Sequence, residues 1–114
     1  MFKYQNDDLN HIFAALADPT RRALLARLEQ QDTLSVSELA QPFPVSLPAV
    51  MKHLDVLSAA GLVTREKSGR TVHVRLNAEP MEHAMSWLAR YERFWTHSLD
   101  RLAALLEDET PKED

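Results

Sequence analysis

The sequence predicts a mainly α-helical fold with one small β-hairpin. Apolar residues recur at helical spacing up to about residue 60 and again after residue 80. Between these regions, from Leu62, apolar residues alternate with polar ones, which is typical of a half-buried strand. The chain has 114 residues, of which 45% are apolar and 26% are charged. This length and composition favour a single domain with its own core.

The composition also excludes several classes of protein. The chain has no cysteine, which rules out disulfides, thiolate metal sites and cysteine nucleophiles. No apolar run approaches the roughly 20 residues needed to span a bilayer. The first residues, MFKYQNDDLN, lack the basic and then apolar pattern of a signal peptide. We therefore expect a cytoplasmic protein with no membrane partner.

The net charge of −4 is distributed unevenly along the chain. Residues 35–76 carry five Lys or Arg and three Asp or Glu, a local balance of +2. Residues 77–114 carry four and nine, a balance of −5, and residues 108–114 form an acidic tail. Because phosphate binding depends on the local field, the overall acidity does not exclude a nucleic-acid partner.

Two helices are expected within residues 9–34. The first has Leu9 and Phe13 on its apolar stripe. Asp18 is a suitable N-cap for the second helix. Pro19 suits the first position of that helix, because no backbone donor is needed there.

Two arginines, Arg21 and Arg22, open this second predicted helix. The helix dipole favours acidic rather than basic residues at that end. Their position indicates either a contact with DNA phosphates or pairing with a carboxylate.

Residues 35–60 predict two further helices joined by a tight turn. Ser35 with Glu38 three residues later is a capping-box pattern, which begins a short third helix. Two prolines follow that helix and end it. Ser46 caps the fourth helix, and Gly61 lies just past its end.

Residues 61–76 predict a β-hairpin. Val72, Val74 and Leu76 alternate with polar residues in the second strand. Residues 67–70, with the sequence KSGR, separate the two strands and give the hairpin a basic tip.

The third and fourth predicted helices have the dimensions of a helix-turn-helix motif. In that motif the second helix lies in the major groove of DNA, with its N-terminal residues near the base edges. A core helix of a three-helix bundle would show the same apolar stripe, so periodicity leaves both interpretations open. The hairpin decides between them, because a basic wing beside such a helix places cations next to the DNA backbone. The candidate DNA-binding residues are Ser46, Pro48, Ala49, Lys52, His53, Lys67, Arg70 and Thr71.

Several of these candidates also have an ordinary structural explanation. Pro48 and Ala49, together with Leu47, either contact thymine methyl groups or only pack at the start of the helix. Lys52 either binds a phosphate or a guanine edge, or is only solvated. His53 either contacts DNA or is hydrogen-bonded to neighbouring backbone.

A single long helix is expected over residues 80–107, which contain no Gly, and no Pro after the first residue. Its apolar stripe is wider than one packing face needs, so a partner should cover part of it. A twofold dimer in which the first helix takes part would do so. A ligand pocket among its aromatic residues is the alternative, but an aromatic stripe at helical spacing is typical of packing. The expected dimer-interface residues are Leu9, Phe13, Leu88, Tyr91, Trp95 and Leu102.

Three segments follow one another in a specific order: FAALADPTRRALLARL, LSVSELAQ and VSLPAVMKHLDVLSAAGLVTREKSGRTVHVRL. In these segments and their spacing, over about residues 9–107, the chain resembles the ArsR/SmtB family of bacterial winged helix-turn-helix regulators. The resemblance implies a winged helix-turn-helix fold and a homodimer joined through the first and last helices. It also implies that the fourth helix and the wing of each protomer lie on DNA.

The chain departs from the metal-sensing members of that family. Where those members carry cysteines, this chain has Ser35-Val36-Ser37, and hydroxyls are poor ligands for thiophilic metals. His97 and Asp100 resemble half of the zinc site that other members hold between their last helices. The other half fails, because Met81 stands two residues before His83, where a carboxylate is needed. We therefore expect no cofactor and no metal site, with His97 and Asp100 as weak candidates.

These patterns lead to one functional hypothesis and two alternatives. The leading hypothesis is a homodimeric transcriptional repressor without thiol metal sensing, bound to an inverted-repeat operator in double-stranded DNA. The alternatives are a winged-helix protein-interaction module and a zinc-responsive repressor that uses the last helix. The sequence has no phosphate-cradling glycine loop, paired carboxylates or Ser/His/Asp order, so we do not expect an enzyme.

Overall fold

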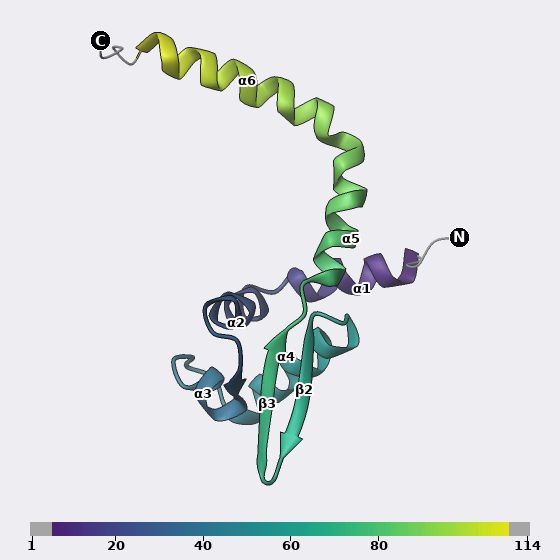
Figure 1. Cartoon of the computed structure of the whole chain (residues 1–114), viewed down its shortest axis with the longest axis vertical. Helices are drawn as coiled ribbons and strands as arrows, with labels where there is room; N and C mark the ends of the chain where they lie inside the picture. The colour runs from purple at the N-terminus through teal and green to yellow at the C-terminus, as the bar shows by residue number, and fades with distance from the viewer. Residues whose placement is uncertain (1–5, 110–114) are drawn as a thin grey trace. The chain divides into compact units, whose positions relative to one another are not determined.

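The computed structural model describes residues 6–109, with side chains over residues 8–107. It divides into two compact units between Ala84 and Met85. The first unit contains α1 (Asn6–Leu16), α2 (Pro19–Gln30), β1 (Leu34–Ser35), α3 (Val36–Ala40), α4 (Leu47–Ala59), β2 (Val63–Ser68) and β3 (Thr71–Leu76) (Figure 1). The division falls within α5 (Glu79–Leu88), and the second unit continues with a 3₁₀ turn at Ala89–Tyr91 and α6 (Glu92–Glu109). The predicted mainly helical fold with a small β-hairpin is confirmed.

The first two helices follow the prediction, with one correction at the start of α1. This helix begins at Asn6, before the boundary at residue 9 that the apolar pattern predicted. Periodicity marks only the turns that pack, whereas the first turn of α1 is polar and gains from acidic residues near the helix dipole. At α2 the prediction holds. Asp18 is the N-cap, its Oδ2 accepts from the backbone N–H of Arg21 at 3.1 Å, and Pro19 is the first helical residue.

Serine hydroxyls cap both helices of the helix-turn-helix motif, as predicted. Ser35 Oγ accepts from the backbone N–H of Glu38 at 3.1 Å, and Glu38 Oε1 accepts from the backbone N–H of Ser35 at 2.9 Å. The backbone N–H and then the side chain of Ser35 hold the pKa of Glu38 below its ordinary value of 4.5. At α4, Ser46 Oγ accepts from the backbone N–H of Ala49 at 3.2 Å. Gly61 follows that helix with a φ of +76°, a left-handed conformation that suits glycine.

The hairpin has a shorter tip than the sequence indicated. Ser68 pairs with Thr71 as the last register pair of β2 and β3, so only Gly69 and Arg70 form the turn. Gly69 has a φ of +63°, as the first position of a tight hairpin turn requires. The predicted four-residue tip over 67–70 is therefore wrong by two residues, because strand pairing continues through Lys67 and Ser68.

A third strand, β1, completes the sheet in the order β1-β3-β2. It pairs antiparallel with β3 through Leu34↔Val74 and Ser35↔His73. The sequence did not predict this strand, because two residues are too few to show an alternating pattern. Its position fixes the start of α3 next to the sheet.

One hydrophobic core holds the helices and strands of the first unit together. Ala15, Leu24, Leu39, Leu54 and Val74, which come from five different elements, are each 0% exposed. Burying a leucine side chain contributes roughly 1.5–3 kcal/mol. The core thus fixes the orientation of α3 and α4 relative to the sheet.

The long C-terminal helix is present as α6, but it is not continuous over 80–107 as predicted. A 3₁₀ turn at Ala89–Tyr91 separates it from α5. Ala84 is the last buried residue among the described side chains, so no core contact fixes the helix geometry beyond it. A 3₁₀ turn needs only a local change of hydrogen-bond spacing. Neither glycine nor proline marks the place, so it could not be predicted from residue type.

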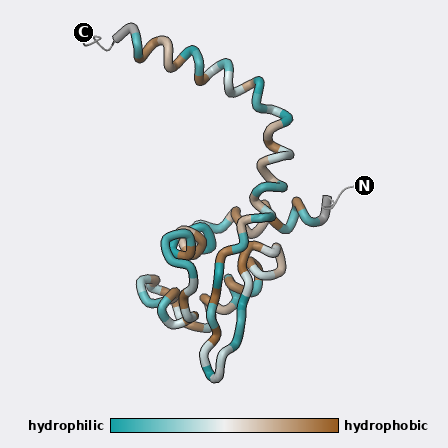
Figure 2. Tube along the Cα trace, viewed as in Figure 1, coloured by the Kyte–Doolittle hydropathy of each residue, from teal (hydrophilic) through white to brown (hydrophobic). Residues whose placement is uncertain are grey.

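The second unit exposes large apolar side chains along α6. Figure 2 shows apolar bands that return along this helix. The exposed large apolar side chains of α6 are Phe94, Trp95, Leu99, Leu102, Leu105 and Leu106. Among residues 6–109, no helix is both long enough and apolar enough to cross a bilayer.

Candidate nucleic-acid interface

Helix α4 packs through one face and exposes the other. Val50, Leu54 and Leu57 are buried, as their spacing predicted. On the other side Lys52 is exposed, and Leu47 at the first position of the helix is 49% exposed. The first two turns of α4 are therefore accessible to a partner.

The five predicted DNA-binding residues in this part of the chain differ in exposure. Ser46, Pro48 and Lys52 are exposed, whereas Ala49 and His53 are half-buried. Because Ser46 Oγ accepts the capping bond, its hydroxyl hydrogen can still be donated to a phosphate or base. Ser46, Pro48 and Lys52 thus form the more accessible part of the predicted set.

The predicted wing residues Lys67, Arg70 and Thr71 are all exposed. Arg70 is the second residue of the two-residue turn, and Thr71 begins β3 directly after it. A guanidinium at the apex of a narrow hairpin can approach a phosphate with little steric hindrance.

An ion pair joins the wing to α4. Arg65 Nη1 in β2 donates to Asp55 Oδ1 in α4 at 2.7 Å. Arg65 is therefore engaged within the protein, and it connects the two elements that carry the predicted DNA-binding residues.

A groove lies between the start of α3, the start of α4 and the wing. It combines hydroxyl groups, one guanidinium and an apolar wall. Its lining includes Ser35, Ser37, Leu47, Met51, Arg70 and Thr71. The structure thus brings the predicted residues Arg70 and Thr71 next to the start of α4.

Ser37, which also lines this groove, was not among the residues predicted to bind DNA. Ser37 is exposed and is the second residue of α3. The available signal was a polar residue early in the first helix of the motif. That position was considered only as a replacement for metal-binding cysteines.

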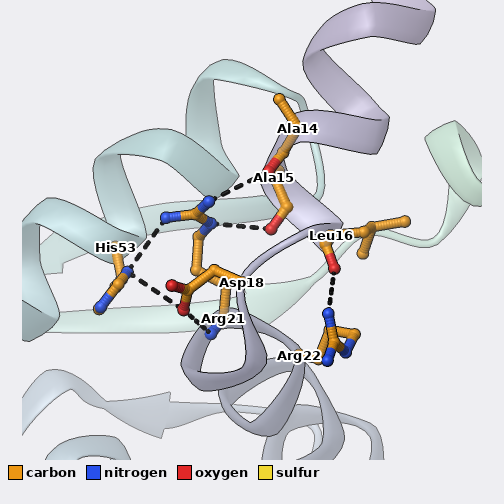
Figure 3. A network of polar contacts seen from close by, with 7 residues as sticks. All are labelled: Ala14, Ala15, Leu16, Asp18, Arg21, Arg22 and His53. Atoms are coloured by element: carbon orange, nitrogen blue, oxygen red, sulfur yellow. Dashed lines mark hydrogen bonds and ion pairs between the residues drawn. The ribbon is translucent and has the colours of Figure 1, made fainter.

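His53 lies in a polar cluster with two residues of the α1–α2 junction (Figure 3). Its Nδ1 is 3.3 Å from Arg21 Nη1 and 3.9 Å from Asp18 Oδ2. The backbone N–H of Arg21, and also the charges of His53 and Arg21, hold the pKa of Asp18 below its ordinary value of 3.8. Figure 3 shows the other ring nitrogen pointing away from this cluster, so only that edge of His53 remains for a DNA contact.

Arg21 and Arg22 bind backbone carbonyls at the end of α1. Arg21 Nε donates to Ala15 O at 2.8 Å and Nη2 donates to Ala14 O at 3.0 Å. Arg22 Nη1 donates to Leu16 O at 2.7 Å. Neither a phosphate nor a carboxylate is needed to explain their position, because the last carbonyls of a helix lack partners within it.

The predicted dimer residues fall in both units. In α1, Leu9 is half-buried and Phe13 is 36% exposed. In the second unit Leu88 is half-buried, whereas Tyr91, Trp95 and Leu102 are exposed. The rings of Trp87 and Tyr91 contact each other, with centroids 5.3 Å apart, which favours packing over a ligand pocket at these two residues.

The weak metal candidates His97 and Asp100 both lie exposed on α6. Within the described part of the chain, no group of three or more potential metal ligands comes together. Two ligands on one helix do not complete a tetrahedral zinc site.

Known proteins resemble this chain over most of its length. A helix-turn-helix domain model matches residues 16–66. The HTH-type transcriptional regulator Rv2034 of Mycobacterium tuberculosis is 38% identical over 109 residues, which cover 96% of each protein. The transcriptional repressor SdpR of Bacillus subtilis is 28% identical over 83 residues, which cover 73% of this chain and 91% of SdpR. The crystal structure of the ArsR family transcriptional regulator RHA00566 is similar with a TM-score of 0.75 and 41% identity, and the match covers 83% of this chain and 97% of that one.

Proposed function

This chain belongs to the ArsR/SmtB family of helix-turn-helix transcriptional regulators, and on that premise we propose that it is a homodimeric repressor that binds a specific operator without thiol metal sensing. The proposed binding site is the exposed start of α4 together with the wing formed by β2 and β3. Helix α4 would enter the major groove, which is about 12 Å wide and admits one helix.

One observation carries this proposal: the groove that α3, α4 and the wing line together. Ser37 and Arg70 lie on its two sides, and both can donate to phosphate oxygens. Lys52 is exposed on the same helix as Leu47, which lines the groove. In a helix-turn-helix motif the second helix lies in the major groove, and Arg, Lys and Ser side chains beside it bind phosphate oxygens.

Distinct roles follow for the residues at the start of α4. The exposed side chains of Val45 and Leu47 suit contact with thymine methyl groups. Lys52 suits a guanine edge or a phosphate, and the Ser46 hydroxyl suits a phosphate. Sequence discrimination would then depend on the apolar contacts and Lys52, whereas affinity would depend on the wing.

The dimer in this proposal is supported by exposed apolar surface at both ends of the chain. Phe13 of α1 is 36% exposed, and Leu99, Leu102 and Leu105 of α6 are each more than half exposed. A twofold dimer buries the same patch of each protomer. It would bind an inverted repeat with half-sites about 10–10.5 base pairs apart, or a multiple of that spacing.

Selection from a pool of random-sequence duplexes tests the proposal. The expected product is an inverted repeat, bound in a fluorescence anisotropy titration far more tightly than a scrambled duplex. If about 6–10 phosphates are neutralised, the affinity should fall by about 10³–10⁵ between 50 and 200 mM salt. A pool that yields no enriched sequence, or an affinity that does not depend on salt, would contradict it.

A second candidate function is a protein-interaction module. The observation in its favour is the apolar pair at the start of α4, where Val45 is 37% and Leu47 is 49% exposed. Such a module should bind no duplex from the pool at about 150 mM salt. The selection experiment therefore separates the two functions.

A further inference from the structure

Arg21 joins three helices at one point of the first unit (Figure 3). It lies in the first turn of α2, and its Nε and Nη2 donate to the carbonyls of Ala15 and Ala14 at the end of α1, at 2.8 and 3.0 Å. Its Nη1 lies 3.3 Å from Nδ1 of His53, which belongs to α4. One guanidinium thus connects the end of α1 to the helix proposed to enter the major groove.

The chemistry of this contact fixes the state of the His53 ring. A guanidinium has only donors, so the hydrogen bond requires that Nδ1 of His53 carries no proton and accepts. The same Nδ1 lies 3.9 Å from Asp18 Oδ2, which can only accept when ionised. One nitrogen cannot serve both partners at once. An unprotonated Nδ1 accepts from Arg21, whereas a protonated Nδ1 is repelled by the guanidinium and donates to Asp18.

Two charged groups on the elements packed against α4, Arg21 and Asp18, lie close to Nδ1 of His53. Glu38 of α3 is bonded to Ser35, and Arg65 of β2 is paired with Asp55. On α1, His11 lies one helical turn before Ala15, whose carbonyl accepts from Arg21, and Asp8 lies about one further turn before His11. Arg22 of α2 donates to Leu16 O.

We infer that Arg21 is a positioning residue for DNA binding. Its contact with His53 keeps α4 packed against the end of α1, and protonation of Nδ1 of His53 breaks this contact. The inference rests on the proposed function, since it concerns how the DNA-binding helix is oriented. Imidazole is the side chain that gains its proton between about pH 8 and pH 5. Operator binding is therefore expected to weaken when Nδ1 of His53 gains a proton.

The place where Arg21 meets His53 explains why this contact would affect DNA binding. His53 lies one position after Lys52 and one helical turn after Ala49, so a rotation of α4 at His53 moves both toward or away from the bases. The other side of the junction is α1, which carries the proposed dimer contact Phe13. A change at Arg21 would alter the angle between the dimer contact on α1 and the DNA-binding helix α4. Because the two α4 helices of a dimer must reach both half-sites at once, such a change would weaken operator binding.

The test uses the operator selected by the wild-type protein at about pH 8. For each variant the measured quantity is the ratio of the operator Kd at about pH 6 to that at about pH 8. His53→Asn keeps an oxygen in the position of Nδ1 that can accept from Arg21 but does not titrate. It also retains the other four histidines, so their protonation is common to both proteins. We expect the ratio to be about tenfold larger for the wild type than for His53→Asn, which corresponds to about 1.4 kcal/mol. Equal ratios would overturn the inference.

Arg21→Lys and Arg22→Lys form a matched pair of variants. Each variant keeps the positive charge but loses the planar guanidinium, whose N–H groups donate to carbonyls at the end of α1. Only Arg21 contacts His53, so Arg21→Lys should lose the pH dependence, whereas Arg22→Lys should keep the wild-type ratio. If both variants lost it equally, the effect would belong to the end of α1 and not to the link with α4.

A measurement on the free protein separates this inference from the proposed function. The ¹⁵N resonances of the His53 ring at about pH 8 should show a proton on Nε2 and none on Nδ1. A proton on Nδ1 would overturn the link even if an operator had been found. A pool that yields no operator would instead overturn the proposed function and, with it, the role of Arg21 in DNA binding.

Discussion

Asp55 of α4 and Arg65 of β2 form an ion pair with an Nη1 to Oδ1 distance of 2.7 Å. The Asp55 side chain is 65% exposed and the Arg65 side chain 27% exposed, so solvent screens the attraction. The pair nevertheless fixes the wing relative to the helix that is proposed to enter the major groove. Its effect on DNA binding should therefore exceed its effect on stability.

Asp55→Asn tests this expectation. The free energy of unfolding in urea should fall by only about 0.2–1 kcal/mol. The ratio of operator affinity to scrambled-duplex affinity should fall by about fivefold, which corresponds to about 1 kcal/mol, because the wing is less well positioned. A double-mutant cycle with Arg65→Gln isolates the pair from the change of charge. An unchanged ratio would show that the wing is positioned by strand pairing alone.

Lys52→Ala and Arg70→Ala should separate base contacts from phosphate contacts. Each side chain can be tested for a phosphate contact in both half-sites of the dimer by its salt dependence. If such contacts exist, removing the side chain should make the negative slope of log affinity against log salt shallower by about two, and it should weaken binding to all duplexes alike. If Lys52 binds a base edge, its removal should instead cost about 1–3 kcal/mol on the selected operator only. Arg75→Ala is the matched control, since Arg75 donates to Thr33 and lines a different pocket. A similar weakening in this control would assign the effect to net charge.

Leu102→Glu should prevent dimerisation. Leu102 is 52% exposed on α6, and a carboxylate there would be buried without a partner in a dimer. We expect the monomer–dimer Kd from sedimentation to rise on the order of 100-fold. Arg101→Glu introduces the same residue one position away and should leave the dimer largely intact. Wild-type protein that sediments as a monomer at micromolar concentration would contradict the proposed dimer.

The capping box at Ser35 should make stability depend on pH in the acid range. Because the pKa of Glu38 is below its ordinary value of 4.5 in the folded state, the unfolded chain binds the proton more tightly. The ionised Glu38 carboxylate therefore stabilises the folded state above about pH 4.5, and this stabilisation is lost as the pH falls through the lower pKa of the folded state. Glu38→Gln should therefore be less stable than the wild type near pH 6, and the difference should shrink toward pH 3. Glu66→Gln, a carboxylate in β2 outside the cap, serves as the control for charge.

Zinc should have no effect on operator binding. His97 and Asp100 supply two ligands on one exposed helix, whereas zinc in proteins takes three or four protein ligands. The operator Kd should be equal in the presence of zinc and of a chelator, for the wild type and for His97→Ala. A zinc-dependent Kd that is lost in His97→Ala would revive the zinc-responsive repressor.

Local signals were enough to predict most of the first unit. Asp18, Ser35 and Ser46 act as helix caps because their short side chains compete for free backbone donors, an effect that needs no tertiary contact. Alternation in β3 was equally clear, since one of its faces meets the core. By contrast, β1 was missed because its pairing with β3 is a long-range contact of two residues. The division between α5 and α6 was missed because neither a glycine nor a proline marks the 3₁₀ turn at Ala89–Tyr91.

The candidate site was predictable in type but not in its contacts. The exposed positions of Lys52 and Arg70 follow from helical spacing and turn chemistry. The partners of Arg21 and His53 do not, because residues 21 and 53 meet only through the packing of α2 against α4. The position of Arg21 therefore suggested a phosphate or a carboxylate as its partner, whereas its guanidinium donates to carbonyls of the preceding helix.

Both glycines of the chain, Gly61 and Gly69, have positive φ angles. A methyl group at Gly61 would lie 3.4 Å from Pro80 Cγ, and at Gly69 it would meet open space, but the left-handed backbone disfavours a side chain at either place. Replacing glycine by alanine stabilises a protein only where the native φ suits alanine, because it lowers the entropy of the unfolded chain. No glycine in this protein meets that condition. Engineering a more heat-resistant variant would therefore have to act on helix surfaces and loops.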